Sequence, residues 1–436
     1  METKDLKFGE LDEGFTIKEA IEEAKRCLNC KNPLCIKGCP IENNIPGFIH
    51  QLSVGNIGAA MHIINEKSNL PAICGRVCPH EKQCVGHCVL NAKKRPIQVG
   101  KLERFAADFD GNMGLIRDKI PQKTRGKVAV IGSGPAGLTV AGDLAREGFN
   151  VMIFEGEQEA GGVLMYGIPE YRLPKDVVRK EVKKIEALGV TFITQCMVGQ
   201  AITVDDMFEQ GFDAVFIGSG TALPKSLDTP GYTLRGVTQS SYFLRMASLC
   251  NTGSIGREEV PVKQGDIVGV IGGGNVAMDA ARTALRMGAG KVYVLFRRTM
   301  DQMSALQTEY NEAVEEGVEF LWETTVTEFI GSNGKLEKIR VKTPEGENFM
   351  PIDRILLAIG SRPANRIVST TSGIEVDDTG YVITKERPYG MTTRKGVFAG
   401  GDVVHTPQTV VLAMKEAKQV AKGIAQFVDA KKLLEE

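Results

Sequence analysis

The sequence lacks the features that mark membrane, secreted and nucleic-acid-binding proteins. Its formal net charge is −1 over 436 residues, which leaves no electrostatic surplus for nucleic acid or an anionic membrane. No apolar stretch approaches the ~20 residues that span a bilayer. Residues 1–26 are rich in Lys and Glu and contain no apolar core of a signal peptide. We therefore expect a cytoplasmic protein.

Histidine is scarce, and cysteine is concentrated at one end of the chain. The five histidines show no metal-ligand spacing, whereas eight of the ten cysteines fall within residues 1–88. Without export, clustered cysteines indicate metal ligands in preference to a disulfide framework. The cysteines form two groups of four, which are Cys27, Cys30, Cys35 and Cys39 in "CLNCKNPLCIKGCP", and Cys74, Cys78, Cys84 and Cys88 in "CGRVCPHEKQCVGHC".

The spacing of the first group predicts how the ligands are shared. In ferredoxin runs of this form, the fourth cysteine, which precedes a proline, binds a different cluster from the first three. We therefore expect Cys39 to belong to a second site. Zinc is an alternative for eight thiolates. The C-x4-C-x3-C-P spacing is not that of a zinc ribbon, however, and the following chain indicates electron transfer, so two iron–sulfur clusters are the favoured interpretation.

The rest of the chain suggests two to four domains. A capping box at Thr16 and Glu19 and the helical spacing of apolar residues predict a small helical domain over the first ~120 residues. Residues 120–126 are the expected linker. Much of the glycine, 49 residues in all, follows apolar β-branched runs, which is typical of α/β nucleotide-binding proteins.

Residues 127–155 carry the strand, glycine loop, helix and strand of a dinucleotide site. Gly132, Gly134 and Gly137 form G-x-G-x-x-G, in which the glycines permit a tight turn, close approach to a pyrophosphate and close packing of helix on strand. The helix N-terminus then faces the phosphate. Glu155 follows the second strand, where a carboxylate binds ribose hydroxyls.

The same pattern recurs over residues 266–299 with a different end. Gly272, Gly274 and Ala277 occupy the three loop positions. Setting "VMIFE" over "YVLFR" places Arg297 where the first unit has Glu155. A carboxylate there would repel a 2′-phosphate, whereas Arg297 and Arg298 would bind it, so we expect the second site to prefer NADP(H).

Here the sequence resembles a known family. With "FAGGD" at Asp402, a helix expected near Thr409, and "CKNPLCIKGCP", "ICGRVCP" and "YGIPEYRLPK", the chain resembles the small subunit of NADPH-dependent glutamate synthase. It is also similar to the N-terminal half of dihydropyrimidine dehydrogenase and to the large subunit of the bifurcating NADH-dependent reduced ferredoxin:NADP+ oxidoreductase. The resemblance implies an α/β protein in which an all-helical iron–sulfur domain (1–124) precedes a discontinuous FAD domain (125–245 and 365–436) with an inserted NADP(H) domain (246–364).

The resemblance also implies the residues at each site. The FAD residues would be Gly132, Gly134, Pro135, Ala136, Gly137, Glu155, Gly162, Leu164, Gly401, Asp402, Thr409 and Val410. The NADP(H) residues would be Gly272, Gly274, Asn275, Val276, Ala277, Arg297 and Arg298. One [4Fe-4S] cluster would be held by Cys27, Cys30, Cys35 and Cys88, and the other by Cys39, Cys78, Cys84 and Glu103.

Two residues are candidates for the last ligand of the second cluster. Counting thiols gives Cys74, because eight cysteines fill eight positions. The resemblance gives Glu103, because related enzymes use Gln or Glu at the matching place, and it is the preferred reading here.

The expected function is electron transfer between NADP(H), FAD and the two clusters. No part of the chain is left over for a final substrate, so a partner oxidoreductase subunit carrying the terminal substrate, ferredoxin or NAD site is expected. The first hypothesis is a subunit of an electron-bifurcating complex, and the second is a glutamate synthase small subunit. A hypothesis of another class is a zinc-stabilised adaptor that senses nucleotides.

Overall fold

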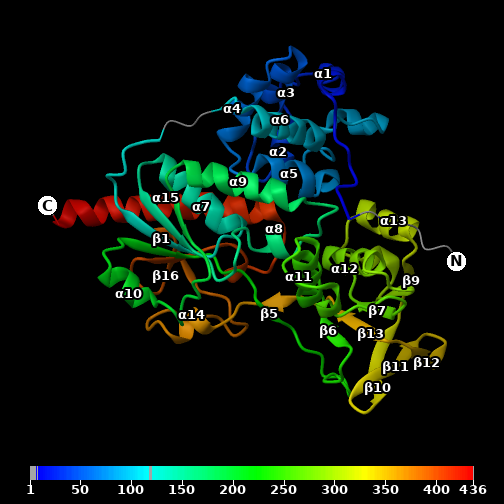
Figure 1. Cartoon of the computed structure of the whole chain (residues 1–436). Coiled ribbons are helices and arrows are strands. Elements are labelled where there is room, and N and C mark those ends of the chain that lie inside the picture. Colours follow the sequence, from blue (N-terminus) through cyan, green and yellow to red (C-terminus); the bar gives the residue numbers. More distant parts are fainter. Residues whose placement is uncertain (1–5, 7, 117–119, 436) are drawn as a thin grey trace. The chain divides into compact units, whose positions relative to one another are not determined.

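The computed structural model describes residues 6, 8–116 and 120–435 and divides into two compact units (Figure 1). The first unit contains residues 8–11, Tyr166–Pro174 and Pro224–Ser361. The second contains Asp12–Met165, Lys175–Leu223 and Arg362–Glu436, apart from the residues outside the described ranges. Each unit is described separately below.

The second unit begins with a group of helices, drawn in blue to cyan in Figure 1. These are α1 (Ile17–Lys25), α2 (Leu34–Gly38), α3 (Ile45–Ser53), α4 (Ile57–Asn65), α5 (Pro71–Val77) and α6 (Val99–Met113), with 3-10 turns η1 (His80–Lys82) and η2 (Val89–Lys93). The capping box predicted at Thr16 and Glu19 is present. Phe48, Ile49 and Leu52 centre an apolar core against which Cys27 and Cys88 pack, so the cysteine-bearing loops surround a small core.

A seven-stranded sheet forms the remainder of the second unit. Its order is β15-β16-β17-β4-β1-β2-β3, and the run from β17 to β3 is parallel. The strands are β1 (Lys127–Ile131), β2 (Asn150–Phe154), β3 (Thr191–Ile193), β4 (Ala214–Ile217), β15 (Thr384–Glu386), β16 (Tyr389–Thr392) and β17 (Val397–Ala399). The helices are α7 (Pro135–Arg146), α8 (Val163–Tyr166), which ends at the unit boundary, α9 (Lys175–Ala187), α10 (Val204–Glu209), α14 (Arg366–Ser369) and α15 (Val410–Glu435), with turn η5 (Gly401–Val403). The β1–α7–β2 motif is the first predicted dinucleotide unit.

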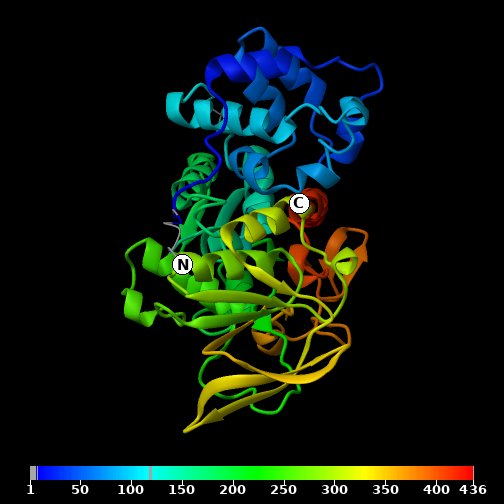
Figure 2. The same cartoon turned by 90° about the vertical axis from the view of Figure 1, so that its right-hand side faces the viewer.

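The first unit is built on a five-stranded parallel sheet of order β6-β13-β7-β8-β9. Its strands are β6 (Val237–Gln239), β7 (Ile267–Ile271), β8 (Lys291–Leu295), β9 (Glu319–Leu321) and β13 (Arg354–Leu357). Its helices are α11 (Ser240–Asn251), α12 (Asn275–Arg286) and α13 (Gln307–Glu316), with turns η3 (Arg257–Glu259) and η4 (Met300–Gln302). Figure 2 shows the antiparallel sheet of β10 (Thr325–Ser332), β11 (Lys335–Thr343) and β12 (Gly346–Pro351) in yellow. The short strands β5 (Leu223–Pro224) and β14 (Ser361–Arg362) pair with each other.

The predicted fold class is confirmed. A helical segment precedes two parallel-sheet nucleotide-binding folds, and the second fold, at Pro224–Ser361, interrupts the first in the sequence. The exact domain limits of 124, 245 and 364 stay a prediction. Within the described part of the chain, every helix is too short or too polar to cross a bilayer.

Candidate functional site

The first predicted group of ligands lines one hollow. Cys27, Cys30, Cys35 and Cys88 all face it, together with apolar side chains of the surrounding loops and of α3. Burial raises the pKa of the Cys27 thiol, and the neighbouring Cys30 and Cys88 raise it further. Burial also raises the pKa of Cys35 to about 11. Four thiols from two distant segments therefore face one hollow, and their binding of a shared cluster stays a prediction.

The second group lies beside α5 and α6. Burial raises the pKa of Cys39 to about 11, with Glu103 and Cys74 among the charges that add to the shift. A hydrogen bond with Cys74, followed by burial, raises the pKa of Cys78. Burial raises the pKa of Cys84, and Glu103 and Cys39 add to it. The structure thus brings together all the predicted ligands of the second site, and Cys74 with them.

The contacts of Cys74 and Glu103 differ in kind. The Cys74 Sγ lies 3.6 Å from the Sδ of Met414 in α15 and 4.0 Å from the hydroxyl of Ser68. Glu103 is only 9% exposed, and no cation of the described residues pairs with it. Burial, followed by the charge of Glu181, raises the pKa of Glu103 to about 8. Cys74 is therefore engaged in packing contacts, whereas the Glu103 carboxyl lacks a positive partner in the part of the chain that the structure describes.

These donor sets fit iron–sulfur clusters. In a [4Fe-4S] cluster each iron takes one protein ligand, so four thiolates surround a volume instead of a single ion, and the first group surrounds such a hollow. Among the described residues, no three or more His, Cys, Asp or Glu side chains are placed to hold a lone metal ion. Because burial raises the pKa of the Cys27, Cys35, Cys39 and Cys84 thiols, cluster binding must displace the protons of these thiols.

In the first glycine loop, the backbone is tightly packed at the first and third glycines and open at the second. Gly132 has φ +93°, and a Cβ there would lie 2.7 Å from the carbonyl oxygen of Gly218. A Cβ at Gly137 would lie 1.9 Å from the carbonyl oxygen of Gly132. A Cβ at Gly134 would meet nothing within 4 Å. The backbone therefore needs glycine at the first and third positions, while the second leaves room for a ligand.

Gly162 and Gly401, two other predicted FAD residues, lie beside this loop. A Cβ at Gly162 would lie 3.0 Å from the Cα of Gly134, and one at Gly401 would lie 2.9 Å from the Cβ of Ala136. Pro135 and Ala136 open α7, Leu164 is buried in α8, and Val410 opens α15 after Thr409. A Cβ at Gly401 would also lie 4.0 Å from the Cβ of Ala413, so the N-termini of α7 and α15 lie near each other. That they bind pyrophosphate and flavin stays a prediction.

Two carboxylates belong to this site. Glu155 accepts hydrogen bonds from the backbone N–H of Ser133 at 2.9 Å and from its hydroxyl at 2.5 Å. Asp402 is half-buried, and burial raises its pKa to about 6. The Glu416 carboxylate in α15 accepts from the N–H of Gly401 at 2.7 Å, which fixes the turn that carries Asp402. No motif in the sequence indicates a role for Glu416.

The second glycine loop has the same form. Gly272 has φ +146°, and a Cβ there would lie 2.4 Å from the carbonyl oxygen of Ala358. A Cβ at Gly274 would meet only the Ser304 hydroxyl, at 3.4 Å. Asn275 opens α12, and its side-chain oxygen accepts from the N–H of Leu306 at 2.9 Å. Val276 is exposed and Ala277 is buried. The space at Gly274 beside the N-terminus of α12 is therefore open, and phosphate binding there stays a prediction.

Strand register corrects one detail of the sequence argument. The residue before the first glycine of each loop pairs with Phe154 in the β1–α7–β2 motif and with Leu295 in the β7–α12–β8 motif. Phe296, not Arg297, therefore occupies the position of Glu155. The alignment of "VMIFE" with "YVLFR" was wrong by one residue, because both strings look like a strand followed by a charged residue.

With Phe296 at the position of Glu155, the second dinucleotide motif still has no acid there. A Cβ at Gly273 would lie 2.5 Å from the Phe296 ring. This ring therefore covers the loop at the position where the β1–α7–β2 motif has the Glu155 carboxylate. Arg297 and Arg298 follow in the turn after β8, and both are exposed. Their binding of a 2′-phosphate stays a prediction.

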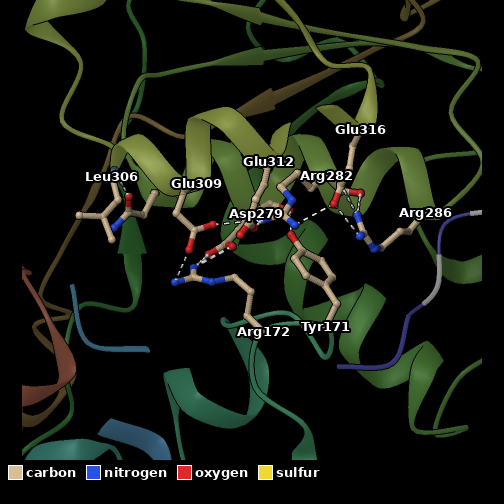
Figure 3. Close-up of polar contacts among 10 residues, drawn as sticks. Tyr171, Arg172, Asp279, Arg282, Arg286, Leu306, Glu309, Glu312 and Glu316 are labelled. Atoms are coloured by element: carbon tan, nitrogen blue, oxygen red, sulfur yellow. Dashed lines mark hydrogen bonds and ion pairs between the residues drawn. The ribbon is translucent and has the colours of Figure 1, made fainter. Parts of the chain in front are cut away.

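Helix α12 is anchored by a buried ion network (Figure 3). Arg172, from "YGIPEYRLPK", donates to both carboxylate oxygens of Asp279 at 2.9 Å and lies 2.8 Å from Glu309. Arg282 lies 3.2 Å from Glu309 and 2.7 Å from Glu316. The helix that presents the second phosphate loop is therefore tied by charge to α13 and to the segment Tyr166–Pro174.

Two family models match the two parts of the chain that carry these sites. Residues 4–115 match the family model described as dihydropyrimidine dehydrogenase domain II, 4Fe-4S cluster. Residues 126–417 match the model described as pyridine nucleotide-disulphide oxidoreductase. The chain is 35% identical to the NADPH glutamate synthase small chain of Halomonas elongata, over 98% of this chain and 94% of that protein. It is 34% identical to the beta subunit of the NADP+-dependent formate dehydrogenase of Moorella thermoacetica, over 90% and 60%.

A solved structure shares the fold. FprA from Mycobacterium tuberculosis superposes with a TM-score of 0.62 over 71% of this chain and 86% of its own, at 18% identity. At that identity the likeness concerns the arrangement of helices and strands alone.

Proposed function

Because the chain belongs to the family of glutamate synthase small chains and related pyridine-nucleotide oxidoreductases, we propose that it is the NADP(H)-linked subunit of a larger electron-transfer complex. As a member of this family it is an NADP(H)-dependent oxidoreductase that carries FAD and [4Fe-4S] clusters. This replaces the hypothesis of a zinc-stabilised adaptor. The two relatives compared above are both named as parts of larger enzymes, which supports a partner subunit.

The proposed binding residues follow from the two loops and the two thiol groups. The open space at Gly134 and the N-terminus of α7 would take the FAD pyrophosphate, with Glu155 toward the ribose and Asp402 at the flavin end. The Gly272 loop would take NADP(H), with Arg297 and Arg298 toward the 2′-phosphate. Bound flavin accepts a hydride and passes electrons on singly to the clusters.

One contact supports the proposed path of electrons from the flavin site to the clusters. The Cys74 Sγ, inside the second thiol group, touches the Met414 Sδ at 3.6 Å, and Met414 lies in the first turns of α15, whose N-terminus is part of the proposed flavin site. Within the second unit, Cys84 is in turn close enough to Cys35 of the first group for the two to interact electrostatically. The order that follows is flavin, second cluster, first cluster and external partner.

The test is anaerobic reduction of the purified protein by NADPH. We expect flavin bleaching followed by loss of the brown cluster absorption, and a much slower reaction with NADH. Gly134→Val should fold, because a side chain at Gly134 meets nothing within 4 Å, but it should be purified without flavin. If that variant keeps FAD and loses NADPH binding, the two loops have been assigned in the wrong order.

The partner distinguishes two members of the family. We favour a bifurcating complex, and the alternative is a glutamate synthase small subunit, which the 35% identity to such a chain supports. Purification under native conditions followed by identification of the copurifying subunit separates them. A large subunit with an amidotransferase domain and an N-terminal cysteine nucleophile would establish the alternative.

A further inference from the structure

The carbonyl oxygen of Gly273, inside the second glycine loop, is satisfied by backbone donors. It accepts from the N–H groups of Ser304 and Ala305, each at 3.0 Å. A carbonyl oxygen has two lone pairs, so these two hydrogen bonds use its capacity. The side-chain oxygen of Asn275 accepts from the next N–H group, that of Leu306, at 2.9 Å. The chain from Ser304 to Leu306 is therefore fastened to the loop through its own N–H groups.

The hydroxyl of Ser304 is not needed for this fastening. Its oxygen lies 3.3 Å from the same Gly273 carbonyl oxygen, which is longer than the roughly 2.5–3.0 Å of a normal O–H···O hydrogen bond. A third donor at that distance adds little to a carbonyl that already has two. Ser304 is also exposed, so burial does not hold the hydroxyl in place. Its proton is therefore available to a better acceptor.

The same hydroxyl borders the open space of the loop. A Cβ at Gly274 would lie 3.4 Å from the Ser304 Oγ. In loops of this form, the second glycine is the one that lets the backbone approach the pyrophosphate. The Phe296 ring packs against Gly273, 2.5 Å from the place of a Cβ there, which helps to keep the loop in this shape. A pyrophosphate over Gly274 would therefore meet the Ser304 hydroxyl as a donor.

We propose that the Ser304 hydroxyl donates a hydrogen bond to the pyrophosphate of the nucleotide at the Gly272 loop, an inference that rests on the proposed function. A hydrogen bond to an anionic oxygen is shorter and stronger than one to a carbonyl. The hydroxyl therefore exchanges a weak partner for a strong one when the nucleotide binds. Because NADP(H) and NAD(H) share the pyrophosphate, Ser304 adds affinity for both, whereas Arg297 is predicted to distinguish them.

The test is calorimetric titration of the intact holoprotein with NADP+, NAD+ and 2′-AMP. The two dinucleotides carry a pyrophosphate, whereas 2′-AMP carries the adenosine and the 2′-phosphate without it. The variants are Ser304→Ala, which removes the hydroxyl, and Ser304→Thr, which keeps one. The matched control is Ser241→Ala, a change at an exposed serine of α11 in the same unit.

We expect Ser304→Ala to weaken the binding of NADP+ and of NAD+ by the same factor, about tenfold or more, because each loses a hydrogen bond to a charged group. Ser304→Thr and Ser241→Ala should bind both dinucleotides as the wild type does. The affinity for 2′-AMP should be equal in all these proteins, since this ligand does not reach the hydroxyl and reports that the site is still folded.

Two outcomes would overturn the proposal by themselves. Equal NADP+ affinity in Ser304→Ala and Ser241→Ala would show that the hydroxyl does not bind the nucleotide. A loss of 2′-AMP affinity as large as the loss of NADP+ affinity would show that Ser304 only shapes the loop.

The variant Gly274→Val separates this proposal from the proposed function, because its side chain would fill the open space. If Gly274→Val binds NADP+ as tightly as the wild type, the Gly272 loop does not hold NADP(H), and both inferences fail. If Gly274→Val loses NADP+ while Ser304→Ala keeps its full affinity, the Ser304 proposal alone fails.

Discussion

Replacement of Arg172 by alanine should destabilise helix α12, which carries the proposed NADP(H) loop. Arg172 is the shared cation of Asp279 and Glu309, with contacts of 2.8 to 2.9 Å (Figure 3). The side chains of all three residues are at most 14% exposed. Removing one partner of a buried pair leaves an uncompensated charge and typically costs about 3–5 kcal/mol. Because Asp279 lies in α12, one turn after Asn275, the loss should reach the phosphate loop.

Hydrogen exchange of the α12 amides in the holoprotein measures this loss locally, which suits a chain of several domains that does not unfold in one step. A loss of about 3–5 kcal/mol corresponds to exchange that is roughly a hundred to several thousand times faster. The matched control is Lys291→Ala, which breaks an exposed pair with Glu319 in the same unit, with 45% and 51% of the side chains exposed. That change should cost about 0–1 kcal/mol.

The pH dependence supplies a second check. Burial raises the pKa of Glu309 to about 7, and Arg172 acts against that shift. In the Arg172→Ala variant the pKa of Glu309 should rise further. A carboxyl whose pKa is raised by folding contributes stability at low pH and loses it as pH rises through the folded value. The variant should therefore be closest to wild type near pH 5 and furthest from it above pH 8. If Arg172→Ala and Lys291→Ala change α12 exchange equally, the ion network does not hold the helix.

Three further predictions concern the cofactor sites. Arg297→Ala should weaken NADPH binding by about 1.5–3 kcal/mol while leaving NADH binding nearly unchanged, as measured by fluorescence titration; equal losses would remove Arg297 from the 2′-phosphate site. Cys39→Ser and Cys30→Ser should each alter a different paramagnetic signal, and loss of the same signal in both would refute the division of ligands. Glu103→Ala should lower iron content and change one cluster spectrum, whereas Cys74→Ser should leave both unchanged; the reverse result would restore the count of eight cysteines.

The sequence predicted those parts of the fold that depend on local chemistry. The Thr16 capping box, the glycines of both loops and the start of α15 after Thr409 are all found in place. The capping box is a hydrogen bond within one turn, and Gly132, Gly137 and Gly272 stand where the backbone excludes a Cβ, so the residue types alone indicate these features. The fold class followed from the order of these elements.

Features that depend on distant contacts were not predictable in the same way. The charges at Asp279 and Arg282 indicate only a polar helix face, and nothing in them points to Arg172, which lies 107 positions from Asp279. The position of Phe296 required the pairing of β7 with β8, because a one-residue slip preserves the look of a strand while moving its side chains to the other face. Contact and register are properties of the folded chain.

The last ligand of the second cluster shows why a count of cysteines is not enough. By count Cys74 and Cys78 are alike, yet the Cys74 sulfur already contacts Met414 and Ser68. Glu103 is buried without a cation among the described residues, and burial keeps its pKa near 8. A buried carboxyl with a raised pKa keeps its proton at neutral pH, and a bound iron would replace that proton. Glu103 therefore stays the predicted ligand, with Cys74 predicted to pack the cluster region against α15.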